Sequence, residues 1–200
     1  SFIQDSREWL VPESVINLGQ GTIRLDARFR NRSSIQAAIQ ARDIQISDLP
    51  LTSLKPLSGT LQSDLSVQGS LQDPRIQLKA SVDKLKAGTE AAQDLPPISA
   101  TFEAAFDGEQ MQSSLETDQA DLSRFQARLT LPGRLSLQPF DVGVRGQLQG
   151  QISGFLDLDS LSRLIFLDGH QFGGKMDIRL DISGPMNNPA VTREFALLPE

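Results

Sequence analysis

The chain has 200 residues and a formal net charge of −6, with acidic and basic residues interspersed along its length. No basic cluster is large enough for a phosphate-binding surface, which argues against nucleic acid as a partner. Because the chain contains no cysteine, disulfides, thiolate catalysis and cysteine-ligated zinc are excluded. No apolar run approaches the roughly 20 residues that are needed to span a bilayer.

Alternation of apolar and polar residues with period two dominates the chain and predicts β-strands. In chain order, the alternating segments are 23–29, 35–41, 61–67, 76–82, 98–106, 111–115, 125–131, 135–137, 142–144 and 176–182. Turn-forming residues such as Asp107-Gly108 and Pro132-Gly133 bound these segments. Because most gaps are short enough for hairpins, we expect about ten strands that pair antiparallel as a meander.

Two segments have helical rather than alternating spacing. Within residues 156–167 the apolar residues follow a helical period at Leu158, Leu161, Leu164 and Ile165. Since Asp157 or Asp159 can cap its start, we expect one short amphipathic helix there, which either plugs the sheet or gates a groove. Residues 6–15 are a weaker helix prediction, interrupted by a proline, and residues 86–97 are typical of a loop.

The chain contains a self-similar pair of segments, near residues 57–83 and 172–195. When the two are aligned, these residues coincide: Gly59 with Gly174, Leu61 with Met176, Leu65 with Leu180, Val67 with Ile182, Gly69 with Gly184, Pro74 with Pro189 and Ile76 with Val191. The pattern describes an alternating strand, a glycine that takes a positive φ, and a proline that fixes the entry into the next strand. We therefore interpret residues 1–200 as a single repetitive β segment of a larger protein.

The repeat has the pattern Gly-x-(apolar)-x-x-x-(apolar)-x-(apolar)-x-Gly-x-x-x-x-Pro-x-(apolar) and resembles that of the TamB-like proteins, in the AsmA-like group. These proteins are the inner-membrane component of the bacterial translocation and assembly module. The resemblance is greatest in the C-terminal third and in residues 57–83. It implies an internal periplasmic segment of an inner-membrane-anchored protein of a Gram-negative bacterium. The implied fold is mainly β, an elongated antiparallel sheet curled into an open trough (a β-taco).

The same resemblance implies a function and partners. Such proteins are thought to carry phospholipid between the inner and outer membranes, to assist outer-membrane protein assembly and secretion, or both. We therefore expect a non-enzymatic conduit or scaffold with an apolar groove that supports outer-membrane biogenesis. The expected partners are the outer-membrane barrel protein of the same module, phospholipid acyl chains, and adjoining segments of the parent chain.

The residues indicate a trough independently of the resemblance. Alternating strands give a sheet one apolar and one polar face, and small inward residues such as Ala27, Ala37 and Ala41 suit a groove better than an interdigitated sandwich. The candidate groove-lining residues are Leu61, Leu65, Val67, Leu78, Ala80, Val82, Ile98, Ala100, Phe102, Ala104, Phe106, Phe125, Ala127, Leu129, Met176, Ile178, Leu180 and Ile182. The alternative is a structural or adhesive β-solenoid or sandwich module with a filled core.

Enzyme chemistry has little basis in the sequence. His170 is the sole histidine and lies in a polar, loop-like stretch, and a helix cap explains Asp157 and Asp159 better than a pair of catalytic carboxylates does. The glycines at 169–174 lack the Lys-Ser/Thr of a phosphate-binding loop, and Trp9 is interpreted as a packing anchor. We therefore predict no catalytic residue, no metal site and no cofactor.

Overall fold

The computed structural model describes residues 3–5, 8–30, 33–49, 57–87, 96–119, 123–144, 146–158 and 174–198. Nearly all of these residues form strands, and one short 3-10 turn, η1 (Ile46–Asp48), follows the fourth strand. The strands are β1 (Ile3–Asp5), β2 (Glu8–Leu18), β3 (Gly21–Arg30), β4 (Ser34–Gln45), β5 (Leu57–Ser70), β6 (Pro74–Ala87), β7 (Ile98–Phe106), β8 (Gln110–Gln119), β9 (Ser123–Leu137), β10 (Phe140–Val144), β11 (Leu148–Asp157), β12 (Lys175–Gly184) and β13 (Ala190–Leu198).

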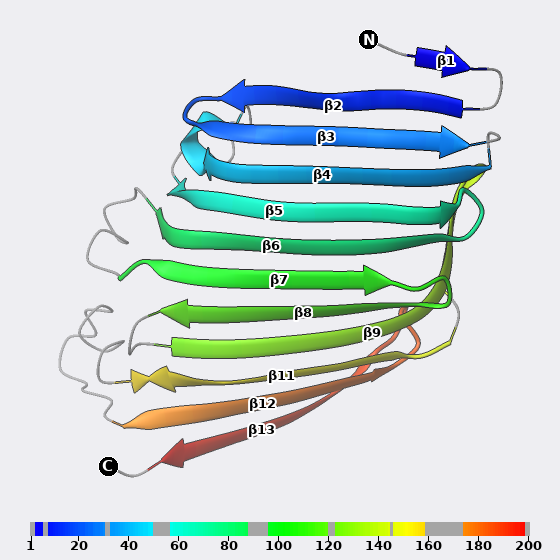
Figure 1. The fold of residues 1–200 in the computed structure, drawn as a ribbon. Helices are drawn as coiled ribbons and strands as arrows, with labels where there is room; N and C mark the ends of the chain where they lie inside the picture. Colours follow the sequence, from blue (N-terminus) through cyan, green and yellow to red (C-terminus); the bar gives the residue numbers. More distant parts are fainter. Residues whose placement is uncertain are drawn as a thin grey trace.

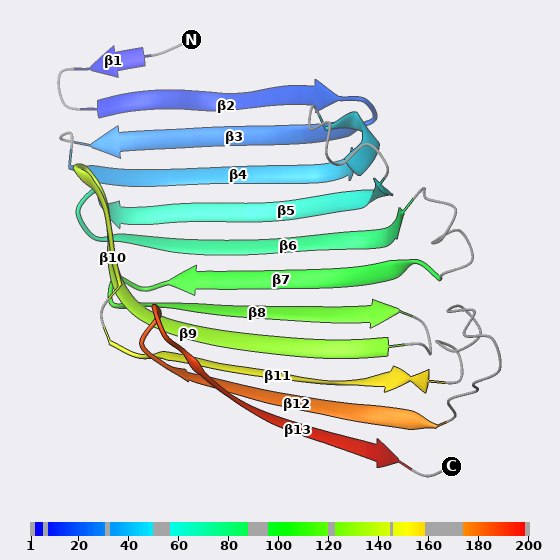
Figure 2. The ribbon, with the colours of Figure 1, turned by 180° about the vertical axis from the view of Figure 1, so that it is seen from behind.

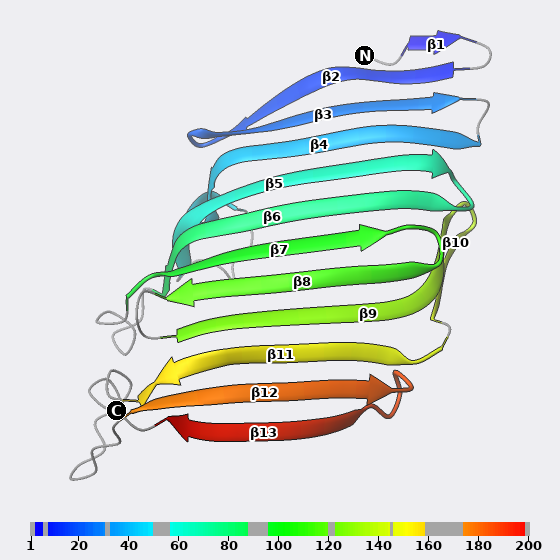
Figure 3. The ribbon, with the colours of Figure 1, turned by 60° about the horizontal axis from the view of Figure 1, so that its bottom comes forward.

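All thirteen strands belong to one sheet whose order follows the chain, except that β10 pairs with β9 outside the main path. Every neighbouring pair is antiparallel. The first and last strands lie at opposite ends of the sheet (Figure 1), and the strands arch along their length (Figure 3). The predicted antiparallel meander, curled into an open trough, is therefore confirmed.

The sheet is a single layer with little buried core. Its accessible surface is 13782 Å², against the roughly 9300 Å² expected for a compact protein of 21.9 kDa. Among the described residues the buried apolar side chains are Ala27, Ala41, Ile44 and Ile46, all in β3, β4 or η1. The described part of the chain therefore lacks the filled core that a sandwich would require.

The helix predicted at residues 6–15 is wrong, because residues 8–18 form strand β2 and pair with β3. Trp9 lies opposite Phe29 and Ile16 opposite Ile23, so an extended backbone places these apolar residues side by side. Pro12 lies where the register shifts between Val11 and Ser14. A bulge in a strand near the edge of a sheet tolerates a residue that has no backbone N–H.

The start of the helix predicted at residues 156–167 is wrong, and the rest of that segment cannot be compared with the structure. Leu156 and Asp157 end strand β11, Leu158 has helical backbone conformation, and residues 159–167 lie outside the described residues. The loop predicted at 86–97 is shorter, because β6 extends to Ala87; residues 88–95 also lie outside the described part. The structure has thirteen strands in its described part, because β1, β2, β11 and β13 lack clean alternation and were not predicted, while the predicted segments 125–131 and 135–137 are both part of β9.

The second half of β9 leaves the main sheet and forms a hairpin with β10. Beyond Pro132, β9 has β10 as its neighbour instead of β8 and β11. The end of this hairpin is fixed by one carbonyl in the β5–β6 turn: the N–H groups of Leu137 and Gln138 donate to Leu71 O at 2.6 and 3.2 Å, and the Ser136 hydroxyl donates at 3.5 Å. Figure 2 shows β10 crossing the ends of neighbouring strands rather than running alongside them. We call this β9–β10 hairpin, residues 133–144, the arm.

The two copies of the internal repeat have matching local geometry. Gly69 and Gly184 both have φ of 110°, the positive value predicted for this position, where a Cβ is disfavoured. The turn that follows contains the same hydrogen bond in both copies: Asp73 N–H donates to Ser70 O at 3.3 Å, and Asn188 N–H donates to Pro185 O at 3.0 Å. The strand pairs β5–β6 and β12–β13 are therefore equivalent units of the fold.

Candidate functional site

The register of the sheet places all the predicted groove-lining residues on one face. Residues directly opposite each other in paired strands share a face. Leu65 lies opposite Leu78, and Leu78 lies opposite Ala104. Farther along the sheet, Leu129 shares a ladder with Ile182 through the β11 residue between them. We call this side of the sheet the apolar face.

The apolar face is continuous from strand to strand, and its side chains remain partly exposed to solvent. Each predicted lining residue is partly exposed, and none is fully buried. The twelve strands of the main path, spaced by about 4.8 Å, extend this face by about 50 Å. A long alkyl chain lying across the strands would therefore contact protein over its whole length.

Several residues of the apolar face were not among those predicted. Their registers place them beside the predicted residues: Ile23, Leu25, Phe29, Ile35, Ile39, Ile44, Ile76, Met111, Leu115, Leu131, Ile152 and Leu156. In β11 the alternation is hidden because Gly150 and Gly154 occupy two of its positions on this face. A Cβ on Gly154 would clash first with the backbone oxygen of Arg124 and then, at 2.5 Å, with Phe125 Cδ1, so the glycine lets the backbone of β9 approach closely as well as making room for the Phe125 ring.

One charged residue belongs to the apolar face. Among the described strand residues that the ladders place on this side, only Arg193 carries a charge; it lies opposite Leu180 on the last strand. The other face holds the ion pairs, for example Arg42–Asp64 at 2.6 Å and Arg124–Asp118 at 3.1 Å. Charge is therefore separated almost completely between the two faces.

The two ends of the strands close the apolar face differently. At the end of β8, the buried side chains of Gln119 and Ser123 form polar contacts: Ser123 Oγ donates to Gln119 Oε1 at 3.3 Å, and Gln119 Nε2 donates to Pro96 O at 2.9 Å. At the opposite end lies the arm, with Phe140 exposed to 76% and Val142 to 61%. The apolar face is thus closed by polar contacts where β8 meets β9, whereas the arm at the opposite end presents exposed apolar side chains.

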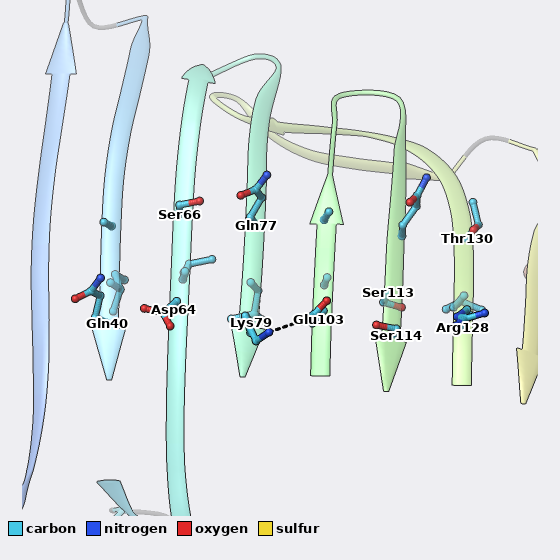
Figure 4. A pocket seen from close by; sticks show the side chains of 18 residues that line it. Gln40, Asp64, Ser66, Gln77, Lys79, Glu103, Ser113, Ser114, Arg128 and Thr130 are labelled. Atoms are coloured by element: carbon cyan, nitrogen blue, oxygen red, sulfur yellow. Dashed lines mark ion pairs between the residues drawn. The ribbon is translucent and has the colours of Figure 1, made fainter. Parts of the chain in front are cut away.

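A shallow depression of about 570 Å³ lies on the polar face, across β4 to β9. Figure 4 shows its side chains, among them Asp64, Lys79, Glu103 and Arg128, which come from β5, β6, β7 and β9. Lys79 Nζ lies 2.7 Å from Glu103 Oε1, and this hydrogen bond, followed by the Glu103 charge, raises the pKa of Lys79. Such a charged lining does not suit acyl chains, so the apolar face remains the candidate site.

Residues weighed for other chemistry are placed as follows. Trp9 packs across from Phe29 on the apolar face, and Asp157 lies opposite Lys175 at the end of β11. Asp159 and His170 lie outside the described residues. Within the described ranges no group of three His, Cys, Asp or Glu residues could hold a metal ion, and no helix there has the length and hydrophobicity to cross a membrane.

Comparison with protein-family models gives no match, and neither the curated proteins nor the solved structures give a significant one.

Proposed function

We propose that the chain is a non-enzymatic apolar conduit in which phospholipid acyl chains shelter while they pass between membranes. The observation that carries this proposal is the apolar face, which is continuous and partly exposed and whose described strand residues are uncharged except for Arg193 on the last strand. Each methylene that leaves water for such a surface gains about 0.8 kcal/mol. Because the sheet has no second layer in its described part, this surface needs an apolar occupant to reduce its contact with water.

The biological setting of the proposal follows from the repeat. The match of residues 57–83 and 172–195 to the TamB-like pattern supports a periplasmic segment of an inner-membrane-anchored protein, in phospholipid transport between the inner and outer membranes. The outer-membrane barrel protein of the same module is the proposed partner at the far membrane. Nascent strands of outer-membrane proteins, which also expose alternating apolar residues, are the second proposed cargo.

The test is native mass spectrometry of the purified chain, with lipid extraction in parallel. The key variant is Ala104→Asp on the apolar face, and the matched control is Ala105→Asp, the next residue, which faces the polar side. We expect phospholipid to co-purify with the wild type and with Ala105→Asp. Ala104→Asp should retain at least about tenfold less, because an unpaired carboxylate beside an acyl chain costs more than the roughly 1.4 kcal/mol that a tenfold change requires. Circular dichroism checks that both variants keep their strands.

Two outcomes would contradict the proposal. Equal lipid retention by the two variants would show that lipid does not lie on the apolar face. A lipid-free mass, with no uptake of added phosphatidylethanolamine or phosphatidylglycerol, would exclude a lipid conduit and leave the protein scaffold as the function to test.

A further inference from the structure

The arm exposes apolar side chains in the interior of the chain, away from the first and last strands. Phe140 is exposed to 76% and Val142 to 61%, and Phe140 is the most exposed large apolar side chain among the described residues. The strands before and after the arm, β9 and β11, each have a partner on both sides in the main sheet. The exposure of the arm is therefore not a consequence of where the main sheet has its edges.

The arm has one apolar and one polar side. Val142 lies opposite Leu135 in its ladder, and Phe140, two residues before Val142, shares that side. The alternate positions hold Arg134 and Asp141, which form an ion pair at 2.8 Å. The two sides of the arm are therefore separated in the same way as the two faces of the main sheet.

The apolar side of the arm continues the apolar face along a single strand. In β9 every second residue from Phe125 to Leu131 belongs to the apolar face. The same alternation runs on through Gly133 to Leu135 and Leu137, which pair with β10 without a shift in register. An apolar molecule on the arm can therefore move onto the main sheet without crossing a polar residue of this strand's apolar side.

Hydrogen bonds fix both ends of the β9 part of the arm. Gly133 N–H donates to Glu109 O in the β7–β8 turn at 2.8 Å, and Leu137 N–H donates to Leu71 O in the β5–β6 turn at 2.6 Å. The arm consequently lies across the ends of these strands (Figure 2). A surface that is already ordered loses less conformational entropy when it binds a ligand. The exposed side chains of the arm are therefore a preorganised contact surface.

The chemistry of the arm favours a lipid chain over a protein partner. Its only charged residues, Arg134 and Asp141, neutralise each other, so the arm offers no free charge to a charged partner. A second copy that added to β10 would pair with its five residues, whereas a stable interface takes roughly 20–30 residues from each partner. An acyl chain is uncharged, needs no hydrogen bond, and gains free energy from each methylene that leaves water.

We infer that the arm is the place where a phospholipid acyl chain passes from a bilayer onto the apolar face. Phe140 and Val142 contact the chain first, and Leu135 and Leu137 lead it onto the first part of β9. The inference rests on the proposed lipid conduit and specifies where lipid enters it. Because most of the binding surface lies on the main sheet, the arm determines the rate of lipid uptake more than the amount retained.

The test compares Gln substitutions on the two sides of β10. The double variant Phe140→Gln with Val142→Gln makes the apolar side polar, and the control Gly143→Gln places the same side chain on the polar side. A Cβ on Gly143 would meet no atom within 4 Å, so the control fits the structure. Stopped-flow fluorescence measures uptake of phosphatidylglycerol with a pyrene-labelled acyl chain from phosphatidylethanolamine–phosphatidylglycerol vesicles. Native mass spectrometry measures the lipid retained at equilibrium.

We expect uptake to slow by about three- to tenfold in the double variant and to change by less than about twofold in the control. Retained lipid should stay within about twofold of the wild type in both. A second measurement leaves the arm's other residues unchanged: p-benzoylphenylalanine in place of Phe140 should cross-link to lipid when it is irradiated with the vesicles. Circular dichroism checks that every variant keeps its strands.

The possible failures are distinguishable. Lipid retention with equal uptake rates in the double variant and the wild type would overturn the inference and leave the proposed conduit standing. An equal slowing by Gly143→Gln, or cross-links from position 140 to a second protein chain instead of lipid, would also overturn it. A wild type that retains no lipid would overturn the proposed conduit and the inference together.

Discussion

The two edge strands of the described sheet are built differently, and the difference indicates which of them resists pairing with a further strand. Beside β2, the short strand β1 covers Glu8 to Leu10, and a bulge at Pro12 interrupts the ladder. Glu8 also pairs with Arg28 and Arg30 of β3, each at 3.2 Å. Strand β13 has neither a proline nor a bulge, and its one edge device is the inward charge of Arg193.

The strands near these edges also differ in burial. Among the described residues, Ala27, Ala41, Ile44 and Ile46 are buried in β3, β4 and η1, and Pro74 is buried at the start of β6, whereas every residue of β13 is exposed. In a single-layer sheet, local stability is therefore expected to depend on where the chain covers itself. A strand that paired with an exposed edge such as β13 would then bury the most apolar surface per residue.

The largest expected effect is the difference in stability loss between a variant at a buried position and a variant at an exposed one. Ile44 is 1% exposed and Phe195 is 58% exposed. Ile44→Ala should lower the free energy of unfolding by about 2–4 kcal/mol, because it leaves a cavity at one of the most buried positions of the described chain, whereas Phe195→Ala should cost less than about 1 kcal/mol. Urea unfolding followed by circular dichroism measures both. Equal losses of unfolding free energy in the two variants would mean that Ile44 in β4 is packed no more firmly than Phe195 in β13.

A smaller effect is expected on self-association. Arg193→Leu restores the residue type found at the equivalent position of β6 and removes the inward charge, so dimers through β13 should form about three- to tenfold more tightly. The matched change at the other edge, Pro12→Val, should have less than about a threefold effect, because β1 still covers part of β2. Sedimentation velocity over a concentration series measures both. A larger effect of Pro12→Val would reverse the assignment of the protected edge.

The sequence predicts the sheet best where alternation alone determines the outcome. In β5, β6, β7 and β12 each apolar residue occupies every second position or nearly so, and short turns then determine which residues face each other. A one-residue slip would move the whole apolar set to the other face. That is why the predicted lining residues all lie on one side of the sheet.

The parts that sequence reasoning missed depend on tertiary contacts or on glycine. Gly154 has no side chain to mark the period of β11, although its lack of a Cβ is what admits the backbone of Arg124 and the ring of Phe125. Strand β2 has a disturbed period because the bulge at Pro12 adds residues to it. The arm leaves the sheet through hydrogen bonds to the carbonyl of Leu71, which is 65 residues from Ser136 in the sequence. No local pattern encodes a contact at that separation.

The smallest expected effect tests a turn far from both edges. Asp107, in the β7–β8 turn, accepts hydrogen bonds through Oδ1 from the N–H groups of Glu109 and Gln110, each at 3.0 Å. These two bonds, with that of Glu109 the larger cause, lower the pKa of Asp107. A carboxylate whose pKa is lowered by folding stabilises the protein above its unfolded pKa of about 3.9, and this stabilisation is lost as the pH falls through the lower folded pKa.

Asp107→Asn should therefore remove the contribution of this carboxylate to the fall in Tm at acidic pH. The amide oxygen can still accept both bonds but does not ionise, so Tm at pH 6 should fall by about 1–2 °C relative to the wild type, with the difference disappearing toward pH 3. Differential scanning calorimetry across this pH range measures it. Glu109→Gln is the control, because it removes a charge from the same turn but leaves the carboxylate of Asp107 in place. If Glu109→Gln changed the pH profile as much as Asp107→Asn, general charge in the turn rather than the hydrogen-bonded carboxylate would be the cause.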